Sequence, residues 1–320
     1  MRSRIARRWI VAALVPLLGA GVALTKRTAH AEDSAADKVE QNERCAVRLS
    51  MALLGASPEA NLVSAKEPQA LVDDMVKTPA FIERFARFIN SELSGTPSET
   101  AGNDPVYFLA HHVLTQNKPW TDLFMGPYSL TATAEGITVG NDPNGLGYFK
   151  SPVWQKKFAG NEEQGVMIVA AFRTIQNTTG LELNASVGVP DEDRSAEGRK
   201  APACRGCHYD PWFALDKVAL LLPKRTGAGA EMTIGPFPAA APQQILSTTV
   251  SDYKQLVTKL VESEMFGFNQ CRRVFKFLYG RQENQCEAAT FDKCVDTLAE
   301  TKDIKKAVAT VAKDASFCTN

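Results

Sequence analysis

Apolar residues recur every three or four positions along most of this 320-residue chain, and proline or glycine stands at the ends of these stretches. The spacing predicts amphipathic helices that bury one face. Strand candidates are few and weak, so the predicted fold class is all-α, that is, mostly α-helical with minor strands. The helical stretches are residues 37–58, 67–95, 104–120, 161–180 and 251–317, and the strand candidates are residues 128–134 and 231–235.

Two of the helical stretches carry further local signals. In residues 67–95, Pro79 divides two helices, and Thr78 is the expected N-cap of the second. In residues 161–180, acidic residues stand where the first turn of a buried helix is expected, which suits the helix dipole. Glycine and proline are frequent in residues 128–160 and 181–242, which are predicted to be loops.

The N-terminus has the layout of a secretory signal peptide. Four arginines precede an apolar run over residues 9–24, and the small-x-small sequence Ala29-His30-Ala31 follows. Cleavage is expected after Ala31, which predicts export to the periplasm or cell envelope. A retained membrane anchor is the alternative, although the apolar run is short for a span of about 20 residues.

Charge excludes one class of partner. The whole chain has 36 basic and 36 acidic residues, but residues 1–31 hold six of the basic ones and no acid. The mature chain would therefore have 30 against 36, a net charge of −6. A mildly acidic chain is not expected to bind nucleic acid, because phosphate binding needs a basic surface. No second apolar run is long enough to span a bilayer.

The segment "PACRGCHYDPWF", residues 202–213, is the most chemically specific part of the sequence. Its Cys-x-x-Cys-His order is the attachment motif of a c-type haem. Cys204 and Cys207, three residues apart, can each form a thioether with one porphyrin vinyl group. His208 then lies below the iron and offers an imidazole nitrogen as the proximal axial ligand. The motif therefore predicts one covalent haem c.

A zinc site and a redox dithiol are two other interpretations of the motif. A zinc site needs a fourth ligand and usually a second Cys/His pair, whereas the nearest other cysteine, Cys271, lies far downstream. A redox dithiol of the thioredoxin type needs a βαβ context, which the sequence lacks. Neighbouring residues suit haem: the aromatic side chains of a surrounding pocket would be Tyr209, Trp212 and Phe213. The cations that would meet the propionates are Arg199, Lys200 and Arg205, for which a solvated loop is the alternative.

Several blocks of the chain resemble the planctomycete-type cytochrome c family, a group of exported mono-haem proteins built from domains of unknown function. The blocks are "RLSMALLGASPEANL", "ALVDDMVKTPAFIERFARFINSEL", "HHVLTQNKPWTDLFMGPYSLT", "ACRGCHYDPWFALD" and "LVESEMFGFNQCRRVFKFLYGRQ". The sequence departs from that family in a short spacer between His208 and Asp210, in Trp212-Phe213, and in "AGNEEQGVMIVAAFRTIQ" before the motif. The resemblance implies an exported c-type cytochrome and little beyond.

The sixth coordination position decides what such a haem does. Met232 lies 24 residues after His208 in the Gly- and Pro-rich segment "GAGAEMTIGPFP", the kind of loop from which small cytochromes supply a methionine. It is the first candidate, with an ordinary half-buried strand residue as the alternative. His112 or His111 is the second candidate, although both flank the apolar stripe of their helix.

Two function classes follow from these observations. The first is an electron-transfer cytochrome, which exchanges electrons with an unknown redox partner protein. The alternative is a peroxidase-like haem enzyme with an open distal position. The single motif favours the first, since it provides no second haem to feed a catalytic one. A structural or sensing haem is a third hypothesis.

Five cysteines lie outside the motif, and export favours disulfides among them. In an antiparallel helix hairpin, residues equidistant from the turn face each other. This register predicts the disulfides Cys271–Cys294 and Cys286–Cys318, with Cys45 left free and buried.

The chain is thus predicted to have four parts. They are a signal peptide (1–31), an N-terminal helical domain (36–130), a loop-rich haem c-binding region (131–247) and a C-terminal helical domain with disulfides (248–320).

Overall fold

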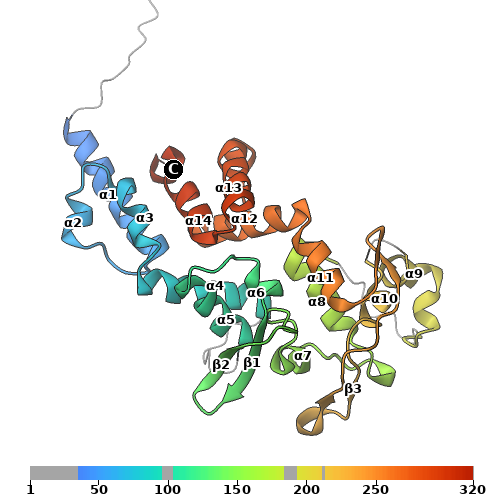
Figure 1. Ribbon diagram of the computed structural model, residues 1–320. Coiled ribbons are helices and arrows are strands. Elements are labelled where there is room, and N and C mark those ends of the chain that lie inside the picture. The colour runs from blue at the N-terminus through green and yellow to red at the C-terminus, as the bar shows by residue number, and fades with distance from the viewer. Residues whose placement is uncertain (1–34, 96–103, 184–192, 211–212, 320) are drawn as a thin grey trace, which may run out of the picture.

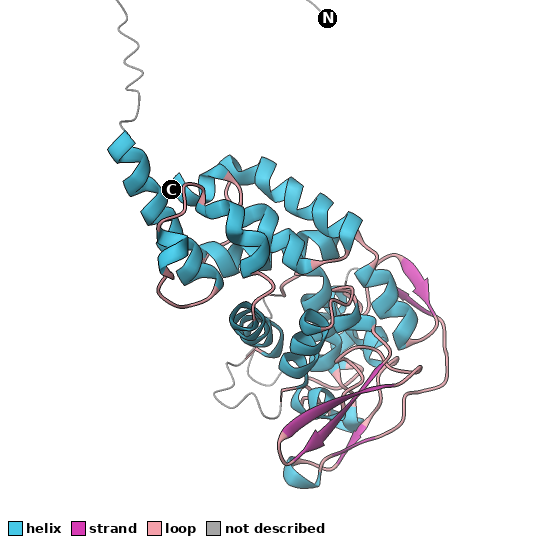
Figure 2. Ribbon diagram, turned by 60° about the vertical axis from the view of Figure 1, so that its left-hand side comes forward, coloured by secondary structure: helices cyan, strands magenta, loops and turns pink. Residues whose placement is uncertain are grey.

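A computed structural model describes residues 35–95, 104–183, 193–210 and 213–319, and most of them are α-helical (Figures 1 and 2). The predicted all-α class is confirmed, with three small antiparallel strand pairs as its only sheets in these ranges. The predicted signal peptide lies outside the described residues. Within them, no helix has both the length and the apolar character that a membrane span requires.

The N-terminal helices follow the predicted pattern. Thr78 caps the second helix of the 67–95 stretch, since its hydroxyl accepts a hydrogen bond from the Phe81 amide at 3.3 Å. Gly95 ends that helix in the left-handed conformation, with φ of 72°. The elements are α1 (Ala35–Leu53), α2 (Ala60–Val63), η1 (Pro68–Leu71), α3 (Val72–Met75), α4 (Pro79–Ser94), α5 (Pro105–Thr115) and α6 (Asp122–Met125).

The middle of the chain contains more regular structure than the predicted loops. Residues 128–160 form a hairpin and a short helix. The acidic residues at 162–163 precede the buried helix and are not in its first turn. Gln164 and Gly165 have positive φ, so the backbone turns between these acids and the helix. The elements are β1 (Tyr128–Thr133), β2 (Gly136–Asn141), α7 (Pro152–Lys157), η3 (Glu163–Gly165), α8 (Ile168–Thr179), η4 (Gly198–Lys200), α9 (Pro202–His208), α10 (Leu215–Ala219), β3 (Arg225–Thr226), η5 (Gly229–Glu231), β4 (Thr233–Ile234), β5 (Gln243–Ile245) and β6 (Thr248–Val250).

The C-terminal part is helical, as predicted. Its helices lie close to α1 and α4, so that the last residues of the chain return to the first helix (Figure 1). The elements are α11 (Tyr253–Val261), α12 (Glu264–Tyr279), η6 (Gln285–Glu287), α13 (Ala288–Thr301), α14 (Ile304–Ala312) and α15 (Ala315–Thr319).

One hydrophobic core includes residues of most of the helices, although α9 contributes no buried residue to it. The rings of Phe85 in α4 and Phe277 in α12 meet edge to face at 4.9 Å, and those of Phe124 in α6 and Phe266 in α12 at 5.0 Å. Tyr148, which follows β2, packs against the same Phe124 at 5.7 Å. The boundaries predicted near residues 130 and 247 stay predictions, but buried side chains pack together across both.

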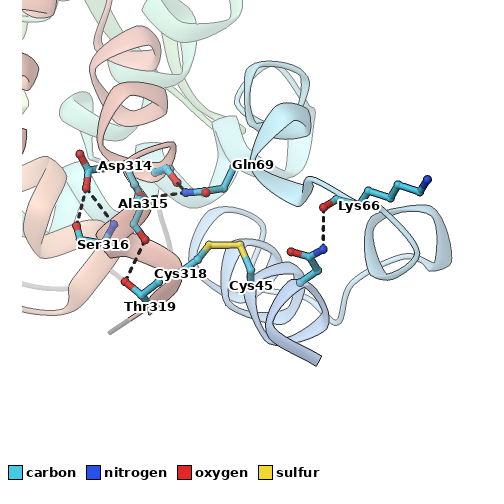
Figure 3. Close-up of a disulfide and its surroundings, with 10 residues drawn as sticks. Cys45, Lys66, Gln69, Asp314, Ala315, Ser316, Cys318 and Thr319 are labelled. Carbon is cyan, nitrogen blue, oxygen red and sulfur yellow. Dashed lines mark hydrogen bonds between the residues drawn. A yellow bond between two sulfur atoms is a disulfide. The ribbon is translucent and has the colours of Figure 1, made fainter. Parts of the chain in front are cut away.

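Of the two predicted disulfides, one is confirmed and one is wrong. Cys271 and Cys294 are bonded between α12 and α13, with Cα atoms 6.0 Å apart. Cys318 is bonded instead to Cys45, whose Cα atom is 4.9 Å away, so Cys45 is buried but not free (Figure 3). Cys286 is exposed and forms no disulfide.

The wrong pairing has a local cause. It assumed one continuous helix over residues 304–317, whereas α14 ends at Ala312 and a separate helix, α15, begins at Ala315. The Gln69 side chain donates hydrogen bonds to the carbonyls of Ala312 and Asp314 at 2.8 and 2.9 Å, which satisfies the backbone at this break (Figure 3). With this bend, Cys318 lies against Cys45 in α1.

A buried carboxylate begins α13 and gives a pH-dependent prediction. Glu287 accepts two hydrogen bonds of 2.7 Å from Arg281 and one of 3.0 Å from the Asn284 amide. The hydrogen bonds from Arg281 hold the pKa of Glu287 below its ordinary value, although burial opposes them. The ionised carboxylate therefore stabilises the folded state at pH values above the ordinary Glu pKa, and this contribution is lost as the pH falls through the folded-state pKa.

We expect Glu287→Gln to lower the free energy of unfolding by about 1 kcal/mol at neutral pH. The difference from the wild type is expected to vanish in acid, below the folded-state pKa. Urea unfolding at a series of pH values measures it, with Glu300→Gln, an exposed position near the end of α13, as the control. A difference that stays constant with pH would show that Glu287 does not act through its charge.

Candidate functional site

The motif residues lie on one side of the short helix α9. Pro202 occupies its first turn, where a missing amide hydrogen costs nothing, and the helix ends at His208. Cys204, Cys207 and His208 are three and four residues apart, a spacing that places side chains on one helical face. Cys207 is exposed and the other two are half-buried, and no disulfide joins the cysteines.

A carboxylate fixes the orientation of the motif histidine. Nδ1 of His208 lies 2.7 Å from Oδ2 of Asp216, the second residue of α10. A carboxylate only accepts hydrogen bonds when ionised, so Nδ1 carries the proton and donates it to Asp216. The free electron pair of the ring is then on Nε2, the nitrogen available to a metal ion.

Asp216 is itself held by two further side chains. Arg199 donates from Nε to both carboxylate oxygens at 3.1 Å and from Nη2 to Oδ1 at 2.8 Å. The Tyr209 hydroxyl shares its single proton between Oδ1 of Asp216 at 3.2 Å and the carbonyl of Ala196 at 3.0 Å. Burial raises the pKa of Asp216, but the hydrogen bonds from His208 and Arg199 outweigh it and hold the pKa below its ordinary value. The carboxylate is therefore ionised at neutral pH.

Packing sets the position of Asp216. α10 lies against α8, and its Leu215, Val218 and Ala219 are buried there. Ala214, also buried, begins the helix with a left-handed φ of 47°, which turns the chain sharply after the motif. Since the apolar side of α10 is fixed on α8, the carboxylate at its first turn is fixed relative to α9.

Of the three cations near the motif, Arg199 does not have the role suggested by the sequence. Arg199 is buried, with 7% of its surface exposed, and its guanidinium is committed to Asp216 and, at 3.4 Å, to Glu162. It is therefore not available to a propionate. Lys200 and Arg205 are exposed and form ion pairs at 2.7 and 3.0 Å, the pairs being Lys200–Glu197 and Arg205–Asp210. Trp212 lies outside the described residues, while Phe213 is half-buried.

Met232 lies in the β3–β4 hairpin, whose base is attached to the same network. Arg225 in β3 donates from Nη2 to the carbonyl of Glu162 at 2.7 Å. The side chain of Glu162 in turn reaches Arg199. Gly165, at φ of 71°, lets the backbone of Arg225 pack closely against it, because a Cβ atom at position 165 would collide with the carbonyl of Arg225. Met232 itself is half-buried after the turn η5.

The two candidate histidines on α5 are not near the motif. Figure 1 shows α5 in the middle of the ribbon, below α4, and α9 at its far right-hand end. His111 contacts Thr115 at 3.4 Å, and His112 meets the ring of Tyr128 at 5.3 Å. Burial lowers the pKa of His112. These contacts are local to α5 and β1, and the arrangement does not bring either imidazole to His208.

The alternative interpretations of the motif find no support in the geometry. Among the described residues, no three or more His, Cys, Asp or Glu side chains are grouped as a bare metal ion would require. Zinc therefore has no set of four ligands there. The strands in these ranges pair antiparallel, whereas a thioredoxin-type dithiol requires a parallel βαβ unit.

A haem c makes smaller demands on the chain, which the residues present satisfy. It needs two thiols on one helical face and one imidazole with a free Nε2, because the porphyrin supplies the remaining equatorial ligands. Cys204, Cys207 and His208 provide these groups. The Nδ1 hydrogen bond to Asp216 is the kind of contact by which proteins orient a metal-bound histidine.

Sequence reasoning missed two residues of this site. Asp216 was visible as an acid eight residues after His208, at the start of the apolar pattern Leu215-x-x-Val218. That pattern predicts a short helix with a carboxylate in its first turn, which is the observed arrangement. Glu162 has no such signal, because it lies 46 residues before His208 and meets Arg199 only through the fold.

No family model matches this chain, and searches of curated proteins and of solved structures found no match.

Proposed function

We propose that this protein is an exported mono-haem c-type cytochrome that transfers electrons. Cys204 and Cys207 would hold the haem through thioethers, and Nε2 of His208 would be its proximal axial ligand. The observation that carries the proposal is the 2.7 Å contact of His208 Nδ1 with Asp216, on a helix face that also bears both cysteines. The haem would supply the one-electron chemistry of its iron, and the chain would supply attachment, orientation and polarity.

The sixth ligand is proposed to be Met232. Its hairpin is anchored at its base through Arg225 and Glu162 to Arg199, although in Figure 1 both this hairpin and α5 extend away from α9. A thioether ligand is typical of electron-transfer cytochromes, in which it raises the reduction potential. The physiological electron donor and acceptor would be other proteins.

Export is supported by the disulfides. Cys45–Cys318 and Cys271–Cys294 are typical of proteins that fold in an oxidising compartment. Haem attachment to cysteine requires the same compartment, and the N-terminal sequence provides the signal. We therefore place the protein in the periplasm or cell envelope. The resemblance to the planctomycete-type cytochromes agrees with this assignment.

One observation favours the alternative, a peroxidase-like haem enzyme. An ionised carboxylate on Nδ1 makes the imidazole a more basic ligand, and a basic proximal ligand stabilises oxidised iron. An enzyme would use this effect with an open sixth position, whereas an electron carrier fills that position. The spin state of the haem therefore distinguishes the two functions.

We expect the protein to carry one covalent haem when it is produced with its signal sequence in a host that matures c-type cytochromes. A denaturing gel stained for haem peroxidase activity reports the covalent link. Cys204→Ala/Cys207→Ala is expected to abolish the band, because both thioethers are lost. Cys286→Ser, which removes an exposed cysteine outside the motif, is the matched control and is expected to retain the band. Colourless wild-type protein from such a host would contradict the proposal.

A further inference from the structure

The ionic network behind His208 is larger than ligand orientation alone requires. A single backbone carbonyl is enough to hold Nδ1 of a metal-bound histidine. Here the acceptor is a carboxylate with 7% of its surface exposed, held by a guanidinium that is equally buried. Burying two charges is costly unless each forms several hydrogen bonds or ion pairs. We therefore expect this buried pair to have a function beyond orienting His208.

The charges in this network oppose one another in their effect on the imidazole. The negative Asp216 draws the Nδ1 proton and makes Nε2 more electron-rich. Arg199 and Tyr209 donate hydrogen bonds to the same carboxylate and withdraw part of that negative charge. The electron density on His208 is thus set by the balance between one acceptor and two donors.

We infer that Asp216 is a positioning residue that sets the reduction potential of the haem through His208, and that Arg199 and Tyr209 moderate its effect. The inference deepens the proposed function and rests on it. An electron-rich imidazole stabilises ferric over ferrous iron, so Asp216 lowers the potential. The two donors to Asp216 weaken that effect and raise the potential.

The inference predicts opposite shifts for substitutions in one hydrogen-bonded cluster. Asp216→Asn keeps an oxygen acceptor of the same shape but removes its charge, and is expected to favour ferrous iron about ten-fold. For a one-electron couple this raises the potential by about 59 mV. Arg199→Gln and Tyr209→Phe leave the carboxylate with fewer donors and are expected to shift the equilibrium toward ferric iron, Tyr209→Phe by the smaller factor.

The chain offers a matched control for the change of charge. Asp210 lies two residues after His208 and pairs with Arg205 at 3.0 Å on the exposed side of the motif. Asp210→Asn makes the same chemical change as Asp216→Asn without touching the imidazole. Because exposed charges are screened by solvent, it is expected to shift the ferric-to-ferrous ratio by less than about two-fold.

The experiment is a redox titration of the purified, haem-loaded full chain against mediators at one pH, with haem content measured for every variant. Opposite signs for Asp216→Asn and Arg199→Gln, with little change in Asp210→Asn, support the inference. A purely structural role would loosen His208 in every variant and shift both potentials in the same direction, which would overturn it. If either buried variant does not fold, the direction of the potential shift in Tyr209→Phe decides. An upward shift of the potential, or no shift, overturns the inference.

Haem content distinguishes failure of the proposed function from failure of the inference about Asp216. A wild-type protein that binds no covalent haem overturns the proposed function, and the inference with it. Normal haem in every variant with coincident potentials overturns only the inference.

Discussion

Removal of the Cys45–Cys318 disulfide is expected to cause the largest loss of stability of any single bond in the fold. The bond joins positions 273 residues apart, and the conformational freedom that a crosslink removes from the unfolded chain grows with the length of the loop. Cys45→Ser/Cys318→Ser is therefore expected to lower the free energy of unfolding by about 5 kcal/mol. In a chain of this size, this lowers the unfolding midpoint by roughly 10–20 °C.

Two matched variants test the explanation through loop length. Cys271–Cys294 spans 23 residues, and its removal is expected to cost about 3 kcal/mol. Cys286→Ser changes an exposed cysteine that forms no disulfide and is expected to cost less than about 0.5 kcal/mol. Urea unfolding without reductant measures all three. An equal cost for Cys45→Ser/Cys318→Ser and Cys286→Ser would show that the ends of the chain are not joined as described.

Met232→Ala is expected to convert the visible spectrum of the haem from a low-spin to a high-spin form. If the thioether is the sixth ligand, its loss converts low-spin, six-coordinate iron to a high-spin form. The absorption band of iron–sulfur coordination in the oxidised protein disappears with it. Visible spectra of the oxidised and reduced protein measure the change.

Met265→Ala is the control for the methionine, because Met265 lies on α12 and is 38% exposed. Its spectrum is expected to match the wild type. An unchanged spectrum in Met232→Ala together with a high-spin form in His112→Ala would assign the position to histidine. It would also require α5 to lie differently from its place in Figure 1. A high-spin haem in the wild-type protein would favour the peroxidase-like haem enzyme.

Local sequence signals predicted the elements well where those signals were strong. The proline at position 79 with Thr78 before it, and the glycine at 95, give the observed ends of α4 because their effect is confined to one helical turn. The register of Cys271–Cys294 could be predicted for a similar reason. A short turn between two helices leaves little choice about which residues face each other.

The rest depended on contacts between distant parts of the chain. The Cys45–Cys318 bond results from the bend between α14 and α15, which Gln69 stabilises from more than 240 residues away. Arg199 resembles a solvated cation in the sequence, and only the packing of α10 on α8 places Asp216 against it. The motif could therefore be read directly, whereas the residues that orient His208 could not.

Peptide mapping after trypsin digestion tests the central claim, covalent haem on both motif cysteines, most directly. Trypsin cleaves after Arg205, between the two cysteines, and so separates peptide 201–205 from peptide 206–217. A haem c bound at Cys204 and Cys207 would keep these peptides joined under reducing conditions, with the added mass of one haem, because thioethers resist thiol reductants. Two separate, unmodified peptides after reduction would contradict the account, whether or not a disulfide had linked them before.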